Sequence, residues 1–389
     1  MQLEPLSYHV EVARRLETTE PALWDWFGSE AFANRYKEKT SDDLLRSAIR
    51  LDRSGVNEHR YQLAEKARDA LGLSEPITLY QMHDKIGVPN AYLVFVPGQI
   101  VIAFDGRILE LLATDAELLD LLGHEISHYK LFTTDNGRFL SADRLLRWML
   151  QRDHCPAEFF ETWRRYQLYS EIYCDIGGLI ACGDLEATVR GLVRVIADFK
   201  DANADSYLAQ AREIMAKGFD GSRGTTHPEL HVRVLAVANA SQMDAGTLNA
   251  MIRTLISGRI ELGALDLIDQ NALCALTRQA VDGVLSKADA RSDGAVAHAR
   301  QMFTDYALPD ARRPAPAVST DTLAPSAIDY LAYILLDFAT VDDNASNAAI
   351  AACAIAADEI GIGARFREIA RQELKGRRAI LSGLVTRAA

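Results

Sequence analysis

The sequence has few cysteines, and they show no regular spacing. The five cysteines, Cys155, Cys174, Cys182, Cys274 and Cys353, are odd in number, scattered and without a CxxC pair. This pattern excludes a disulfide framework and a thiolate metal site, and it indicates reduced thiols. We therefore expect a protein of the cytoplasm.

The sequence also lacks long apolar runs and an excess of basic charge. Its most apolar run, 348–357 (AAIAACAIAA), is well short of the roughly 18–20 uncharged residues that a membrane span needs. The first residues, MQLEPLSYHVEVARR, have no basic segment followed by an apolar one, so we expect no signal peptide. With 42 Lys and Arg against 54 Asp and Glu, the net charge is -12. A basic surface for nucleic acid is therefore excluded.

Hydrophobic residues, in contrast, are plentiful, at 49% of 389 residues, enough for packed cores in two or three domains. Residues 8–72 show apolar positions three and four apart, which is typical of helices. Helical periodicity returns at Ile108 and continues almost to the end. Between them lie three extended segments rich in Ile, Val, Tyr and Phe, the last two forming a predicted hairpin: 77–84, 91–98 and 99–106. We predict a mainly α protein with a small β-sheet, of the α+β class.

Two segments interrupt the helical part. A Gly-rich loop covers 218–228, and a stretch rich in Pro, Ala and Ser at 308–326 has no periodic apolar face and indicates a linker. These breaks suggest an N-terminal helical region, a central domain, a helical extension, the linker and a C-terminal helical bundle, at 1–69, 70–240, 241–307, 308–326 and 327–389.

The central segment ATDAELLDLLGHEISHYKL has the residues of a metal site. Thr114 and Glu117 have capping-box spacing, which predicts a helix that begins near Thr114. His124 and His128 lie four apart on one face of that helix, within reach of one ion. Glu125 lies beside them and can take a proton from an attacking water. The alternative is an amphipathic helix with an HExxH sequence that occurs by chance.

A third ligand is expected in QLYSEIYCDIGGLIACGD. Glu171 and Asp175 lie four apart on one face of an otherwise apolar helix. Glu171 can complete the three protein ligands that a catalytic zinc usually has, and Asp175 can hydrogen-bond the far nitrogen of a ligand histidine. Gly177 and Gly178 would let the two helices pack closely. The alternative is two acids in contact with solvent on a helix surface.

The segment TTHPELHVRV contains two further candidates. His227 closes the Gly-rich loop, and Arg233 follows on the next helix. Either cation could stabilise the oxyanion that forms when water attacks a carbonyl carbon. The alternative for a His-Pro pair at this position is a helix cap.

Together these segments resemble a known family. DAELLDLLGHEISH, SEIYCDIGG and TTHPELHVRV, in this order, are similar to the zinc metallopeptidase family of CAAX-prenyl endopeptidases and HtpX-type proteases (gluzincins). Upstream, PNAYLVFVPGQIVIAFDGRILELL is similar to the family's Asn-Ala-Phe strand and edge strand. The resemblance covers roughly 70–240, and it extends to neither the membrane helices nor the prenylated substrates of many relatives.

The resemblance implies one Zn²⁺ bound by His124, His128 and Glu171, with Glu125 as the general base. Asp175 would be the hydrogen-bond partner of a ligand histidine.

The resemblance also implies the surroundings of this site, with His227 and Arg233 lying over it and Asn90 near the substrate backbone. The strand 99–104, with Ile100 and Ile102, would pair with an extended peptide.

The C-terminal bundle, with LLDFATVDDNAS between helices, resembles TerB-like helical domains. Asp337, Asp342 and Asp343 lack the spacing and the glycine of an EF-hand, which favours a solvated loop over a cation site. The bundle would then be a docking or regulatory module for a protein partner.

We therefore predict a zinc-dependent endopeptidase that acts on peptides or proteins. The alternative is a catalytically silent or latent zinc-binding scaffold that binds partners through its helical flanks.

Overall fold

The computed structural model describes residues 2–30, 32, 43–83, 89–308, 320–342 and 347–374. The chain divides into two compact units, Met1–Gly258 and Arg259–Ala389. We call them the first and the second unit and describe each by itself. Most of the expected linker at 308–326 lies outside the described residues.

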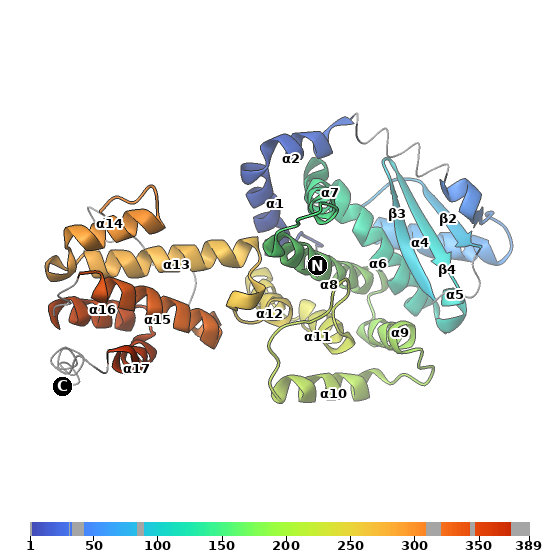
Figure 1. The fold of residues 1–389 in the computed structure, drawn as a ribbon. Coiled ribbons are helices and arrows are strands. Elements are labelled where there is room, and N and C mark those ends of the chain that lie inside the picture. Colours follow the sequence, from blue (N-terminus) through green and yellow to red (C-terminus); the bar gives the residue numbers. More distant parts are fainter. Residues whose placement is uncertain are drawn as a thin grey trace. The chain divides into compact units, whose positions relative to one another are not determined.

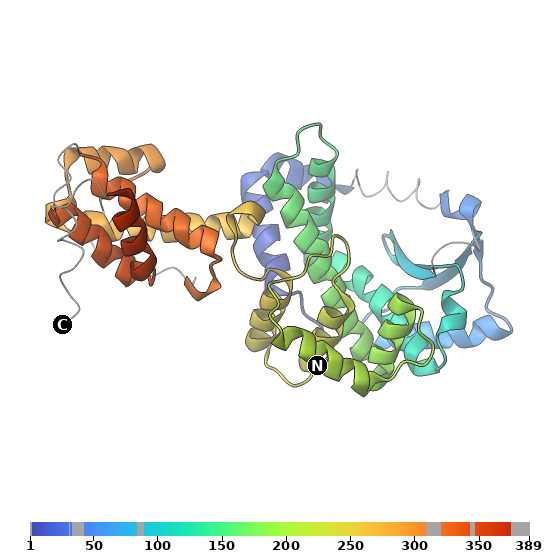
Figure 2. The ribbon, with the colours of Figure 1, turned by 60° about the horizontal axis from the view of Figure 1, so that its bottom comes forward.

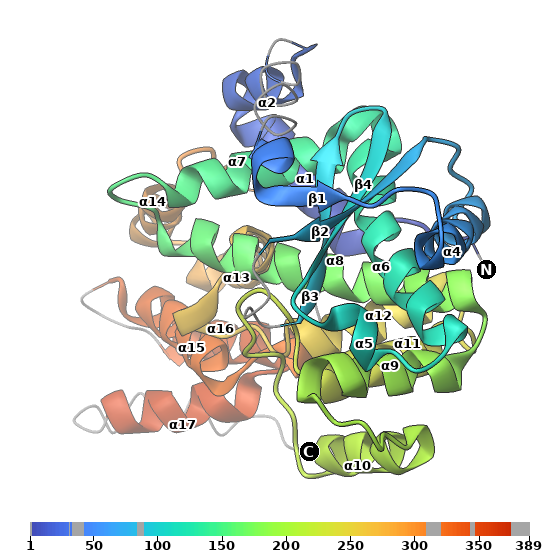
Figure 3. The ribbon, with the colours of Figure 1, turned by 90° about the vertical axis from the view of Figure 1, so that its right-hand side faces the viewer.

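The first unit contains a mixed four-stranded sheet in the order β1-β2-β4-β3 (Figure 3). The strands are β1 (Ala48–Arg50), β2 (Ile77–Met82), β3 (Asn90–Val96) and β4 (Gln99–Asp105). β2 and β4 are parallel, whereas β3 and β4 form the predicted antiparallel hairpin. The hairpin turns at Gly98, whose φ of 78° suits glycine. The described part of the chain confirms the predicted fold class, mainly α with a small sheet.

The position of β4 contradicts one prediction. β4 pairs with β2 on one side and with β3 on the other, and Ile100 and Ile102 are fully buried. A strand whose backbone groups are paired on both sides cannot add a peptide strand. The predicted substrate strand 99–104 is therefore wrong, and β3 is the edge strand on this side of the sheet.

The helical pattern expected over 8–72 is also partly wrong, in the segment DDLLRSAIRL at 42–51. Ala48–Arg50 is strand β1, which pairs with β2 in antiparallel register. The Leu51 backbone N–H continues this ladder to the Leu79 carbonyl at 2.9 Å. Pairing with a strand that is distant in the sequence overrides the local helical pattern here.

Eleven α-helices are described in the first unit besides the sheet. They are α1 (Ser7–Thr19), α2 (Pro21–Gly28), α4 (Val56–Ala70), α5 (Ile108–Leu111), α6 (Asp115–Thr133), α7 (Arg138–Leu150), α8 (Ala157–Cys182), α9 (Leu185–Ala197), α10 (Ala204–Ala216), α11 (Leu230–Ala240) and α12 (Ala245–Ile256). α4 and α6 pack against the sheet, and α8 packs along α6 (Figure 1). As predicted, α6 begins after Thr114, whose Oγ1 accepts a hydrogen bond from the Glu117 N–H.

Glycines allow α6 and α8 to approach closely. A Cβ added at Gly177 would lie 1.8 Å from Ser127 Oγ, and one at Gly178 would lie 2.8 Å from the Asp120 carbonyl oxygen. From the other side, a Cβ at Gly123 would meet Ala181 Cβ at 2.5 Å. No side chain fits between the helices at these positions, so the histidines of α6 lie next to the acids of α8.

The second unit is a helical bundle, drawn in orange and red in Figure 2. It contains α13 (Leu267–Leu285), α14 (Asp293–Met302), α15 (Pro325–Thr340), α16 (Asn347–Glu359) and α17 (Gly363–Glu373). One hydrophobic core spans these helices, from Ile260 to Leu374. Residues 259–307 thus share a core with the C-terminal helices, whereas the sequence analysis separates 241–307 from 327–389.

Two further sequence expectations concern the described helices and the acids of the bundle. None of the described helices has the length and apolar character needed to cross a membrane. Asp343 lies outside the described residues.

Candidate metal centre and active site

Two histidines from α6 and one acid from α8 converge at the centre of the first unit. His124 Nε2 lies 3.5 Å from Glu171 Oε2, and His128 Nε2 lies 3.6 Å from Glu171 Oε1. Bonds of about 2.0–2.2 Å to a tetrahedral zinc place neighbouring ligand atoms about 3.3–3.6 Å apart. The two distances end on different oxygens of the Glu171 carboxylate, and a donor set of two imidazoles and one carboxylate is one that zinc takes in catalytic sites.

Asp175 and Arg233 form the layer behind these residues. Asp175 Oδ1 lies 2.9 Å from His124 Nδ1 and can accept a hydrogen bond from its N–H, which leaves Nε2 as the nitrogen that would bind a metal. Arg233, from α11, donates from Nε and Nη2 to the two oxygens of Asp175 at 2.7 and 2.6 Å. The guanidinium is buried, and its Nη2 lies 3.5 Å from Glu171. This geometry favours a role in holding Asp175 over the predicted role as an oxyanion donor.

Burial and charge shift the acid–base properties of the cluster. Burial alone would raise the pKa values of Glu171 and Asp175, but neighbouring cations outweigh it and lower both. Burial lowers the pKa of His128 to about 4, which keeps this imidazole neutral. Burial would lower the pKa of His124 as well, but the neighbouring acids Asp175, Glu171 and Glu125 outweigh it and raise this pKa to about 9. The cluster thus offers a neutral imidazole and an ionised carboxylate to a cation.

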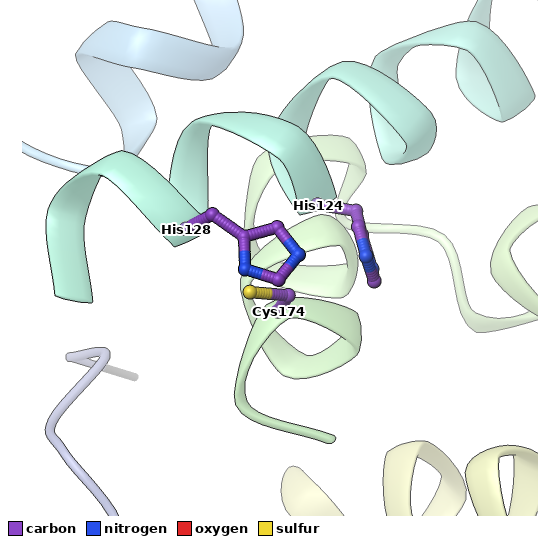
Figure 4. A group of neighbouring side chains, drawn as sticks. All are labelled: His124, His128 and Cys174. Carbon is purple, nitrogen blue, oxygen red and sulfur yellow. The ribbon is translucent and has the colours of Figure 1, made fainter. Parts of the chain in front are cut away.

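Cys174 lies next to the two histidines, which sequence spacing does not suggest. Nitrogen atoms of His124 and His128 and the Cys174 Sγ all lie within 4.8 Å of one another (Figure 4). Burial raises the pKa of the Cys174 thiol well above its usual value, whereas Glu171 is an anion already. Because zinc binds the thiolate form, we favour Glu171 over Cys174 as the third ligand.

Glu125 faces the edge strand β3. Its Oε2 accepts a hydrogen bond from the Leu93 backbone N–H at 2.8 Å. Burial raises the pKa of Glu125 to about 7. A carboxylate with this pKa can both accept and return a proton near neutral pH.

A cavity of about 330 Å³ surrounds this centre. Besides the central residues, Asn90 and His227 line it, as predicted for groups near a substrate. The end next to α9 has apolar side chains from α6, α9 and the turn before α6, together with the acids Glu117 and Asp120; the apolar ones are Leu112, Leu121, Leu192, Val195 and Ile196. The opposite end is polar, with Asp143, Arg147 and Gln167. The candidate ligands His124, His128 and Glu171 line the same cleft, between the side chains from α9 and the polar group of Asp143, Arg147 and Gln167.

His227 lies at the open side of the cleft. Its Nε2 is 3.6 Å from Glu171 Oε2, and its side chain is 60% exposed. Its Nδ1 lies 2.9 Å from Thr226 Oγ1. The structure therefore brings His227 close to the candidate ligand Glu171.

The structure brings together the predicted His124, His128, Glu125, Glu171 and Asp175. Ile100 and Ile102 are fully buried and do not line the cavity. Sequence reasoning missed the Leu93 N–H, because a backbone donor has no signature in the sequence.

Comparison with known proteins gives one match, which confirms the predicted relationship to a zinc metallopeptidase family. Residues 56–152 match the model of peptidase family M48. The matched segment includes α4, the sheet strands β2 to β4 and all of α6, and it ends before Glu171. Neither the curated proteins nor the solved structures give a match. The match supports a metallopeptidase that acts on peptides or proteins and uses a metal cofactor.

Proposed function

We propose that this chain is a zinc-dependent endopeptidase that binds one Zn²⁺ through His124, His128 and Glu171. The observation that carries the proposal is the convergence of the two imidazole nitrogens on the Glu171 carboxylate at 3.5 and 3.6 Å, with Glu125 beside them. When bound, zinc would polarise the scissile carbonyl and lower the pKa of the attacking water.

Glu125 is the proposed general base. It takes one proton from the water and delivers it to the nitrogen of the leaving amine, so the carboxylate is regenerated in each cycle. The raised pKa of about 7 suits both transfers. His227 supplies the proposed donor to the oxyanion, and Arg233 keeps Asp175 in place behind His124.

The substrate is proposed to bind along the free edge of β3. Alternate residues of a strand direct their N–H and C=O groups to opposite sides. Since the Leu93 N–H points to Glu125, the backbones of Ala91, Leu93 and Phe95 face the cleft. An extended peptide can add to this edge as an antiparallel strand. The mode of recognition expected from the sequence is kept, but the strand is different.

This orientation has a consequence for the two ends of the cleft. Asn90 pairs with Asp105 near α5 and α9, whereas Phe95 stacks on Tyr129 of α6. An antiparallel peptide therefore places the residues after the scissile bond at the end next to α9, which includes Leu192. We expect apolar side chains at that position of the substrate.

The test compares zinc content and peptide hydrolysis in the wild-type protein and the Glu125→Gln variant. We expect one zinc per chain in both, with hydrolysis reduced at least about 100-fold in the variant. Glu110→Gln, at an exposed position of α5, is the matched control and should keep full activity. Equal hydrolysis by wild type and Glu125→Gln would remove Glu125 from its role. Bound zinc without cleavage of a broad peptide library would support the scaffold alternative.

A further inference from the structure

The loop at 217–229, which contains His227, is hydrogen-bonded to a side chain of helix α8. Arg164 Nη1 donates to the carbonyl oxygens of Ser222 and Gly224 at 3.1 and 2.7 Å. Arg164 is only 15% exposed, so these bonds lie largely out of water. The same side chain is fixed from its other edge, because Nε and Nη2 each donate to Glu161 at 2.7 Å. All three nitrogens of the guanidinium are thus engaged in one planar arrangement.

The loop is tightly folded above this contact. A Cβ added at Gly224 would lie 2.0 Å from the His227 carbonyl oxygen, so the backbone of these two residues is in close contact. Glu229 closes the loop, accepting from the Ser222 hydroxyl at 2.6 Å and from the Arg223 N–H at 2.9 Å. A shift at Gly224 is therefore transmitted directly to His227.

The position of the His227 side chain depends on this backbone. The side chain is largely exposed; its Nδ1 lies near Thr226 of the same loop and its Nε2 near Glu171. A side chain with so few neighbours is placed mainly by its own main chain. The loop backbone therefore determines how far the imidazole lies from the metal ligand Glu171.

We infer that Arg164, held by Glu161, positions His227 for catalysis. Arg164 and Glu171 lie seven residues apart on α8, about two turns, and so on the same face of the helix. One rigid helix thus contains both a metal ligand and the anchor of the loop. This inference rests on the proposed function, and it makes Arg164 a positioning residue rather than a catalytic one.

The test is a double-mutant cycle on the full-length zinc-loaded protein, with Arg164→Ala, His227→Ala and the double variant. We expect His227→Ala to lower kcat about 100-fold, and Arg164→Ala to lower it roughly 10- to 100-fold with little change in KM. The double variant should be no slower than His227→Ala, since Arg164 acts through His227. Affinity for a phosphonate peptide that mimics the transition state should fall in parallel with kcat.

Two further variants separate positioning from general damage. Arg164→Lys should recover part of kcat, because an ammonium can still reach the loop carbonyls but cannot form the paired bonds to Glu161. Arg138→Ala removes a comparable ion pair, with Glu17 at 2.7 Å, outside the cleft and should keep the wild-type kcat. Losses in kcat that multiply in the double variant would overturn the inference.

Amide hydrogen exchange tests the anchor without any measurement of activity. The segment 217–229 should exchange faster in Arg164→Ala than in wild type, with the segment around Glu171 unchanged. Equal exchange of 217–229 in the two proteins would overturn the inference even in an active enzyme. Absence of hydrolysis by the wild type would instead contradict the proposed function, and the exchange comparison would still decide whether Arg164 holds the loop.

Discussion

Asp175 is the residue on which two layers of the site depend. Its carboxylate accepts two bonds from Arg233 and lies 2.9 Å from the His124 Nδ1. The contact with His124 fixes the orientation of its ring. The contacts with Arg233 place a buried guanidinium cation beside the Asp175 carboxylate. Removal of the negative charge would leave the guanidinium of Arg233 buried without its partner, which is costly.

We predict that Asp175→Asn weakens zinc binding about 10- to 100-fold. An amide has one acceptor oxygen instead of two, and its NH2 group would face either the Arg233 Nε–H or the shared position near His124, so the His124 ring loses its fixed orientation. Competition with a zinc chelator measures the change in Kd. Asp143→Asn is the control, since Asp143 is equally buried but bonds Arg147 and Gln167 instead. An unchanged Kd in Asp175→Asn would contradict this role.

Glu161 gives a prediction about pH and stability. Burial would raise its pKa, but the bonds from Arg164 and the charge of Arg165 lower it below the ordinary value of 4.5. A lowered folded-state pKa adds stability that is fully present above the unfolded value and is lost as the pH falls through the folded value. The contribution of ionised Glu161 to the free energy of unfolding should therefore be constant above about pH 5 and decrease below about pH 4.5.

The measurement compares urea unfolding of wild type and Glu161→Gln between pH 3 and pH 7. We expect the variant to be less stable by roughly 1–3 kcal/mol near pH 7, with the difference falling at acidic pH. A difference that stays the same down to pH 3 would show that ionisation of Glu161 does not contribute.

Spacing in the sequence identifies the candidate ligands that the structure brings together, but it says less about their surroundings. His124, His128, Glu171 and Asp175 are found from spacing because helical periodicity places residues four apart on one face. Arg233 lies on a third helix, and no spacing in the sequence tells whether its guanidinium meets a substrate or a buried acid. The role of Arg233 therefore required the packing of α11 against α8.

At the scale of elements, the site depends on the close packing of α6 and α8. We predict that Gly178→Ala lowers the free energy of unfolding by about 1–3 kcal/mol, because the new methyl group would meet the Asp120 backbone at 2.8 Å. It should also weaken zinc binding, since His124 and Glu171 would move apart. Gly191→Ala in α9 is the matched control, since its added Cβ would have only ordinary contacts, the nearest at 3.7 Å. Chemical denaturation and chelator competition report both effects, and equal losses in the two variants would contradict the packing argument.

The sheet shows why an element can be predicted and its place still be wrong. The pattern of Ile, Val and aromatic residues correctly predicts β2, β3 and β4 and the hairpin between the last two. However, a third strand decides which strand of the hairpin lies at the edge of the sheet. The local sequence pattern of the hairpin does not show with which of its strands the third strand pairs. The parallel pairing of β4 with β2 places β4 inside the sheet and leaves β3 to face the cleft.

At the scale of the whole molecule, every candidate site residue belongs to the first unit. The core of the second unit begins at Ile260, which forms a bridge with Leu323 and bonds to Thr322 and Ala324. We keep the proposal that this unit is a docking module for a protein partner. The position of the boundary then decides which truncations leave a folded protein.

We predict that a chain cut after Gly258 folds, binds zinc and hydrolyses peptides at a rate within a few-fold of the full chain. A cut after Leu308 should behave differently, because it keeps α13 and α14 but removes α15 to α17, which complete their core. Apolar residues of α13, such as Leu276 and Val284, would then be exposed, and the product should aggregate. Size-exclusion chromatography, zinc content and peptide hydrolysis compare the two chains. A monomeric, well-folded 1–308 chain together with an unfolded 1–258 chain would place the boundary after Leu308 and contradict the division into these two units.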